Sequence, residues 1–148
     1  MPNITQSHRE MIGQSIGENR KIVGTTTVVN VAEVLQKGVT EYPDVVVMNL
    51  MKAKHGKYKS YEDLEISLTP SIPDNAARKG WSLAKRIDRI GTEMSWTHFT
   101  VDWYDTYSDY LKEASQTSKD ADKTYEKMMK LRDITDRVVL EKFIFLNK

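Results

Sequence analysis

Alternating and continuous apolar runs in the first half of the chain predict β-strands. Residues 45–51 are apolar on both faces, a pattern that is typical of an interior strand. Leu64, Ile66 and Leu68 alternate with polar residues, as in a strand with one solvated face. The lysine-rich stretch 52–59 between them contains a glycine that can turn the chain. This pattern predicts a β-hairpin with a basic tip.

The segments before this hairpin are less regular. Residues 7–23 have apolar positions at helical spacing, although two glycines weaken the helix that this spacing predicts. The β-branched run 25–29 favours an extended strand. Asn30 lies three residues before Glu33 in an arrangement like a capping box, which predicts a short helix that Gly38 closes.

The second half of the chain has the periodicity of helices. Apolar residues at spacings of three and four follow Pro73 and predict helices over residues 74–90, 96–114 and 120–141. Because strand patterns come first and helix patterns follow, the expected fold class is α+β. We expect a small antiparallel sheet, made of the hairpin and a further strand, packed against a C-terminal layer of three helices.

The length fits one domain over residues 1–148, with a β-rich part at 1–70 and a helical part at 71–148. The chain has no cysteine, which excludes disulfides, a zinc ribbon and a thiol nucleophile. Apolar runs are too short for a signal peptide or a membrane span. We therefore expect a cytoplasmic protein that binds no membrane, or a virion protein if the source is viral.

Charge is unevenly distributed. The net charge is +1, yet residues 52–89 carry nine basic and five acidic side chains. On a helix over 74–90 the basic residues share one sector, and with the hairpin tip they could bind phosphates or nucleic acid. Alternatively, they are solvated or paired within the chain. The candidate phosphate-binding residues are Lys52, Lys54, Lys57, Lys59, Arg78, Lys79, Lys85, Arg86 and Arg89.

Large rings form one stripe and carboxylates another on the helix predicted over 96–114. The aromatic stripe is either core or an exposed anchor for a partner. The acidic stripe of Asp102, Asp105, Asp109 and Glu113 faces solvent, or faces the basic helix, or holds a metal together with His98. Metal is the least favoured of these, because carboxylates strung along one helix do not converge on one ion.

The helix predicted over 120–141 carries two apolar stripes, which implies contacts on two sides. The helix would be buried either between the sheet and the helix predicted over 96–114, or by another subunit. With the aromatic stripe, the candidate interface residues are Trp96, Phe99, Trp103, Tyr107, Tyr110, Met128, Val138, Val139 and Phe143.

Catalytic motifs are missing from the sequence: it has three separated histidines and no phosphate-binding, nucleotide-binding or hydrolase signature. We expect no enzyme, no cofactor and no metal. The leading hypothesis is an assembly subunit that binds itself or another protein through its C-terminal helices, for example in a viral or phage particle. The alternatives are a nucleic-acid or phosphate-binding module and an acidic-helix inhibitor or adaptor.

Overall fold

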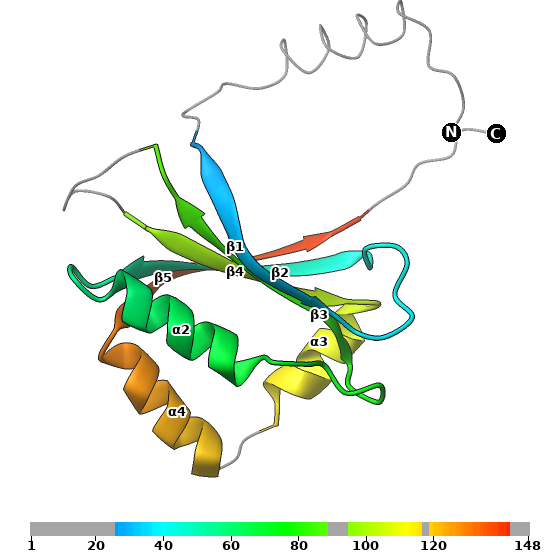
Figure 1. Cartoon of the computed structure of the whole chain (residues 1–148). Helices are drawn as coiled ribbons and strands as arrows, with labels where there is room; N and C mark the ends of the chain where they lie inside the picture. The colour runs from blue at the N-terminus through cyan, green and yellow to red at the C-terminus, as the bar shows by residue number, and fades with distance from the viewer. Residues whose placement is uncertain (1–25, 89–94, 117–118, 143–148) are drawn as a thin grey trace, which may run out of the picture.

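The computed structural model describes residues 26–88, 95–116 and 119–142. Within these ranges the chain forms five strands and three helices (Figure 1). The strands are β1 (Val28–Leu35), β2 (Val45–Ala53), β3 (Arg78–Arg86), β4 (His98–Tyr104) and β5 (Arg132–Glu141). The helices are α2 (Tyr58–Leu68), α3 (Tyr107–Ala114) and α4 (Lys119–Met129). No helix of the described residues is long and apolar enough to span a membrane.

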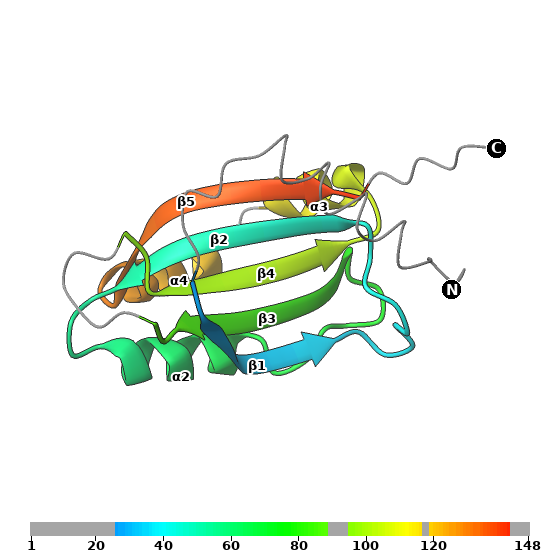
Figure 2. The same ribbon diagram turned by 90° about the horizontal axis from the view of Figure 1, so that it is seen from above.

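The strands form one antiparallel sheet in the order β1-β3-β4-β2-β5. All three helices lie on the same face of this sheet (Figure 1). Figure 2 looks onto the other face, with the strands side by side and the helices behind them. We call these the covered face and the open face. The fold class is therefore α+β, as expected.

The apolar core lies between the covered face and the helices. Met51 of β2, Leu83 of β3 and Met128 of α4 pack around Tyr61 of α2, which is fully buried. The hydroxyl of Tyr61 lies 2.8 Å from Met51 Sδ and donates a hydrogen bond of 3.0 Å to Glu65. This ring therefore ties α2 to the centre of the sheet.

The arrangement of elements differs from the one expected. Residues 58–68 form helix α2 instead of the second strand of a hairpin, because a helix buries Tyr61 and Glu62 together with Glu65, which lies one turn further along. Residues 28–35 form one uninterrupted strand, β1, so the short helix predicted to begin at Asn30 is wrong. Gly38, with φ +85°, turns the chain after β1 instead of closing a helix.

The three long helices predicted after residue 73 are also wrong, because each contains a strand. Segment 74–90 contains β3, in which Trp81 and Leu83 pack in the core while the small residues Gly80 and Ser82 alternate with them onto the open face. Segments 96–114 and 120–141 each divide into a strand and a helix. Thr106 caps α3 by accepting a hydrogen bond of 3.1 Å from the Asp109 amide, which fixes one of these boundaries.

Candidate functional site

The register of the strands places rows of apolar side chains across the open face. Cross-strand partners share a face of the sheet. One row contains Val46, Trp103 and Leu140, which are paired across β4, β2 and β5. The next row pairs Met48 with Val101 and with Val138 in the same way. A third pairs Leu50 with Phe99.

Aromatic rings and one glycine pack closely together on the open face. Gly80 lies between Leu35 and Trp103, and a Cβ added there would be 2.8 Å and 2.7 Å from their side chains. The Tyr42 ring packs on Trp103 with centroids 5.1 Å apart. The Trp96 ring meets Phe99 edge-on at 6.0 Å. These contacts make the face smooth and largely apolar.

Charges on the open face stay at its margins. Glu33 of β1 accepts a hydrogen bond of 2.8 Å from the Tyr42 hydroxyl. Arg86 of β3 lies 4.9 Å above the Trp96 ring and forms an ion pair of 2.7 Å with Asp88. Asp136 of β5 is the cross-strand partner of Leu50. The rows through Trp103 and Met48 carry no charge between β3 and β5.

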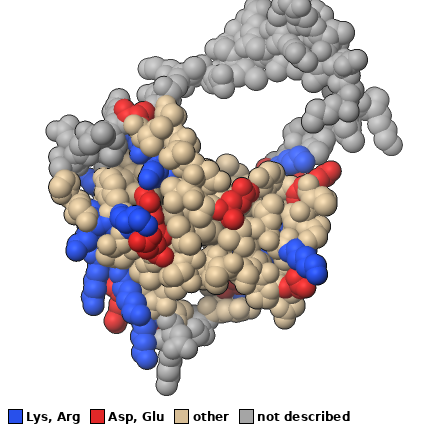
Figure 3. All heavy atoms as spheres, viewed as in Figure 1, with Lys and Arg blue, Asp and Glu red and all other residues tan. Residues whose placement is uncertain are grey.

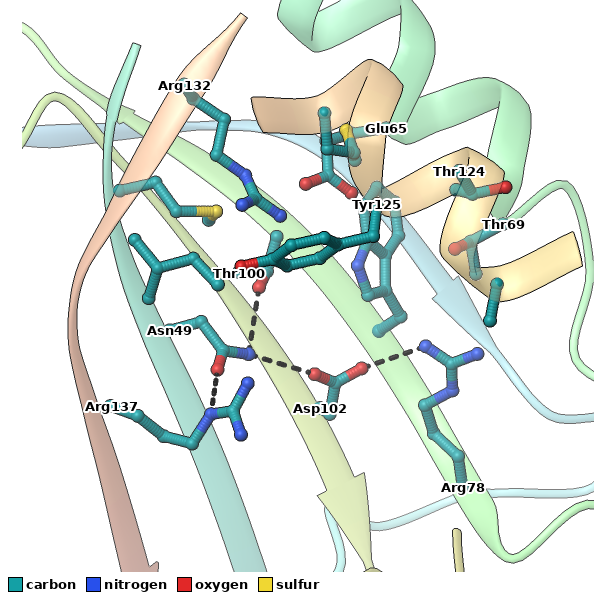
Figure 4. Close-up of a pocket in the computed structure, with 15 residues that line it drawn as sticks. Asn49, Glu65, Thr69, Arg78, Thr100, Asp102, Thr124, Tyr125, Arg132 and Arg137 are labelled. Atoms are coloured by element: carbon teal, nitrogen blue, oxygen red, sulfur yellow. Dashed lines mark hydrogen bonds and ion pairs between the residues drawn. The ribbon is translucent and has the colours of Figure 1, made fainter. Parts of the chain in front are cut away.

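On the covered face, a cavity of about 310 Å³ lies beneath α4, and its lining contains ionisable as well as apolar side chains (Figure 4). Its floor comes from β2, β3 and β4, one wall from β5, and its roof from α2 and α4. Its polar lining consists of Asn49, Glu65, Thr69, Arg78, Thr100, Asp102, Thr124, Tyr125, Arg132 and Arg137.

Asp102 is the centre of a hydrogen-bonded network on the cavity floor. It accepts a hydrogen bond of 2.9 Å from Arg78 Nη1 and one of 3.4 Å from the Asn49 amide. Arg78 Nε also lies 3.4 Å from Glu113 of α3. Burial raises the pKa of Asp102, and the charge of Arg78 opposes that shift. Arg78 and Asp102 thus form an internal ion pair.

Arg132 lies deeper in the cavity and is only 7% exposed. Its Nε finds no hydrogen-bond partner among the described residues, and its Nη1 lies 3.7 Å from Met129 Sδ. Burial also raises the pKa of Glu65, whose carboxylate accepts the Tyr61 hydroxyl. Arg137 stands nearer the solvent and donates from Nε to Asn49 Oδ1 at 2.5 Å.

The structure does not gather the predicted phosphate-binding residues on one surface. Alternation along β3 sends Lys85 and Arg86 to opposite faces, so the basic sector expected of a helix does not form. Lys85 lies 3.4 Å from Glu62, and Lys79 bonds to Gln36 at 3.0 Å. Arg89 lies outside the described residues.

The remaining lysines of this set lie where β2 passes into α2. Figure 3 shows basic atoms gathered at this end of the molecule, with carboxylates beside them. Lys52 is the penultimate residue of β2, Lys54 donates to the Met129 carbonyl at 2.8 Å, and Lys59 pairs with Asp63 one turn along α2. Lys57 lies at the N-cap of α2.

The acidic residues also separate, because segment 96–114 contains both a strand and a helix. Asp102 points into the cavity, whereas Asp105 lies 3.9 Å from Lys79. Asp109 stands in the first turn of α3 and pairs with Lys112 at 3.1 Å. Acidic and basic residues therefore do meet within one chain, at Arg78 and Lys79, although both basic residues lie in strand β3 and only Glu113 of their acidic partners lies in a helix.

The predicted interface residues divide between the two faces. Trp96, Phe99, Trp103 and Val138 belong to the open face. The others lie elsewhere: Met128 in the core, Val139 at the margin of the covered face, Tyr107 and Tyr110 on α3, and Phe143 outside the described residues.

The cavity residues Asn49, Glu65, Arg132 and Arg137 were missed by sequence reasoning. A β-bulge explains part of this. Arg132 and Arg137 are five residues apart, so strict alternation would place them on opposite faces. The register shift of β5 between Ile134 and Asp136 returns both to the cavity. Nothing in the sequence marks this bulge.

No protein-family model matches the chain, and no curated protein matches it.

Proposed function

We propose that the protein is a non-enzymatic assembly subunit in which two copies pack open face against open face. The observation that carries the proposal is the set of apolar rows on the open face. Leu140 at the end of one row is 52% exposed, and Leu35 at the other end is 41% exposed. A contiguous apolar surface of this kind is typical of protein–protein contact sites.

A second copy suits this surface for two reasons. Sheets pack face to face when their apolar sides interdigitate, at a separation of about 10 Å. The charged groups Glu33, Arg86 and Asp136 stand at the margins and include both signs, so two copies meet no like charge at the centre. Marginal charges of this kind set orientation more than affinity.

The sequence predicted self-association through C-terminal helices, and the proposal keeps self-association but assigns the contact to strands. The interface candidates Trp103 and Val138 lie in β4 and β5 instead of in helices. Binding of nucleic acid has less support, since Arg78, Lys79, Lys85 and Arg86 all have carboxylates within 4 Å. Membership of a viral or phage particle stays a prediction.

Two adjacent residues of β5 offer a matched test. Leu140→Asp places a charge on the open face, whereas Val139→Asp places the same charge on the opposite side of the strand. Both side chains are exposed in a single chain, at 52% and 37%, so both variants should fold. We expect Leu140→Asp to weaken self-association by at least about tenfold, because a buried unpaired charge costs several kcal/mol. Val139→Asp should associate like the wild type.

The measurement is the molar mass by light scattering across a concentration series, with circular dichroism to verify the fold. Equal association of both variants and the wild type would refute contact through the open face. A wild-type protein with the mass of a single chain at every concentration would also refute the proposal.

A further inference from the structure

We propose that the cavity beneath α4 binds a small carboxylic acid that has an aromatic or branched apolar body. The cavity lies on the covered face, so this inference is independent of the assembly proposal. It rests on the orphan nitrogen of Arg132, the second guanidinium of Arg137 and the apolar lining between them (Figure 4).

Arg132 is the strongest indication that the cavity binds an anion. Its side chain is more than nine-tenths buried, and its Nε has no hydrogen-bond partner within the described part of the chain. Buried guanidinium donors are normally paired, because losing water without gaining an acceptor is costly. A carboxylate oxygen in the cavity would supply that acceptor.

Arg137 provides a second cationic group on the same wall. Both arginines extend from β5 toward the cavity (Figure 4), and Ile134 of the same strand also lines it. Arg137 uses its Nε for Asn49, and no hydrogen bond is found for its two terminal nitrogens within the described residues. A guanidinium can donate paired hydrogen bonds to a planar carboxylate, so either arginine suits such a ligand.

The charge balance of the cavity favours an anion. Arg78 and Asp102 neutralise each other at 2.9 Å on the far side. On the near side, burial raises the pKa of Glu65, and the charge of Arg132 opposes that shift. Arg132 and Arg137 together outnumber this one carboxyl group. The cavity therefore keeps a positive excess beside β5.

The rest of the lining accepts an apolar body. Trp81, Met51 and Met128 form the inner surface, and all three are buried. Tyr125 of α4 is 55% exposed, which places it at the mouth. A volume of about 310 Å³ is at the lower end for ligand pockets and suits a small molecule.

The test is a titration of the full chain with sodium phenylacetate, followed by two-dimensional nitrogen–proton NMR. The Nε–H signal of Arg132 and the indole N–H signal of Trp81 report directly on the cavity. We expect both to shift saturably, with a Kd below about 1 mM. The indole signals of Trp96 and Trp103, on the open face, should not move.

Three comparisons make the titration decisive. Phenylacetamide has the same shape without the charge, so it should bind at least about tenfold more weakly. Arg137→Gln, at a residue exposed enough to leave the fold intact, should weaken phenylacetate binding by a similar factor. Arg86→Gln removes an arginine from the opposite face and should leave binding unchanged.

Several results would overturn the proposal. These are the absence of a saturable shift, equal binding of phenylacetamide, or wild-type affinity in Arg137→Gln. Inorganic phosphate provides the last arm: if it binds as tightly as phenylacetate, the cavity selects an anion alone and the assignment of an apolar body is wrong.

Discussion

The two faces of the sheet differ in where they place apolar and ionisable side chains. The open face carries Trp103, Met48 and the exposed Leu140 away from the helices, whereas the covered face places Asp102 and Arg78 beside its apolar core. Apolar residues normally go inside and charges outside. An exposed apolar face is typical of a surface that a partner covers, and buried charges are costly unless they are paired or bind a ligand. Both proposals follow from that comparison.

The largest expected effect compares one leucine on each face. Leu83 is fully buried in the core, whereas Leu140 ends a row of the open face. Leu83→Ala should lower the free energy of unfolding by about 3–5 kcal/mol, because it opens a cavity between sheet and helices. Leu140→Ala should cost less than about 1 kcal/mol in dilute solution. Urea denaturation measures both, and equal losses would mean that the two faces are equally buried.

A second prediction concerns the ion pair of the covered face. Arg78→Met leaves Asp102 without its cation and should cost about 2–3 kcal/mol, less than for a fully buried pair because Asp102 can take up a proton. Adding Asp102→Leu removes the unpaired carboxyl group, and we expect recovery of most of the loss. Thermal unfolding of both variants checks this prediction. A double variant no more stable than Arg78→Met would contradict it.

Gly80 tests the packing of the open face. A Cβ at this position would press on Trp103 and Leu35. Gly80→Ala should therefore cost about 1–2 kcal/mol in stability through overpacking and shift the fluorescence of Trp103. Gly38→Ala is the control for the loss of a glycine without crowding. At Gly38 a Cβ meets open space, and the strain comes from the positive φ alone. A neutral Gly80→Ala would mean that this face is loosely packed.

The smallest effect is on the pH dependence of stability. His98 of β4 is buried beside Glu62, Lys85 and the rings of Tyr58 and Tyr61. Burial lowers the pKa of His98 below its ordinary value, although Glu62 opposes this shift. The unfolded chain therefore takes up a proton before the folded chain does. Stability is complete above about pH 6.5 and is lost as the pH falls through the folded pKa.

Urea denaturation between neutral and mildly acidic pH measures this loss. His98→Gln should remove its share of the slope, while His55→Gln, at an exposed turn position, should keep the wild-type slope. An unchanged slope in His98→Gln would place the source of the pH dependence elsewhere.

The sequence was informative where the residue pattern depends only on local burial. The apolar run 45–51 was correctly predicted as an interior strand, because strand β2 lies inside the sheet between β4 and β5. The α+β class was also correct. Segment 78–86 fits helical and strand periods equally well, and only tertiary pairing with β1 and β4 decides between them.

The cavity could not be predicted for a related reason. Its polar lining comes from β2, β3, β4, β5, α2 and α4, which are far apart in the sequence, and its arginines share a wall only because of a bulge. The aromatic residues Phe99 and Trp103 do share one face, as their spacing indicated, but a spacing of four also places two residues on one face of a strand. Periodicity therefore assigned these residues to the wrong element, and their role as interface residues stays a prediction.

The central claim is that the open face is buried against a second copy, and the mass of the wild-type chain in solution tests it most directly. Sedimentation equilibrium over about 1–100 μM should show a mass that rises from one chain toward two, since a reversible dimer follows mass action. The dimer should persist at high salt, because its contact is apolar and salt strengthens apolar burial. A mass of one chain at every concentration, or dissociation caused by salt alone, would contradict this account.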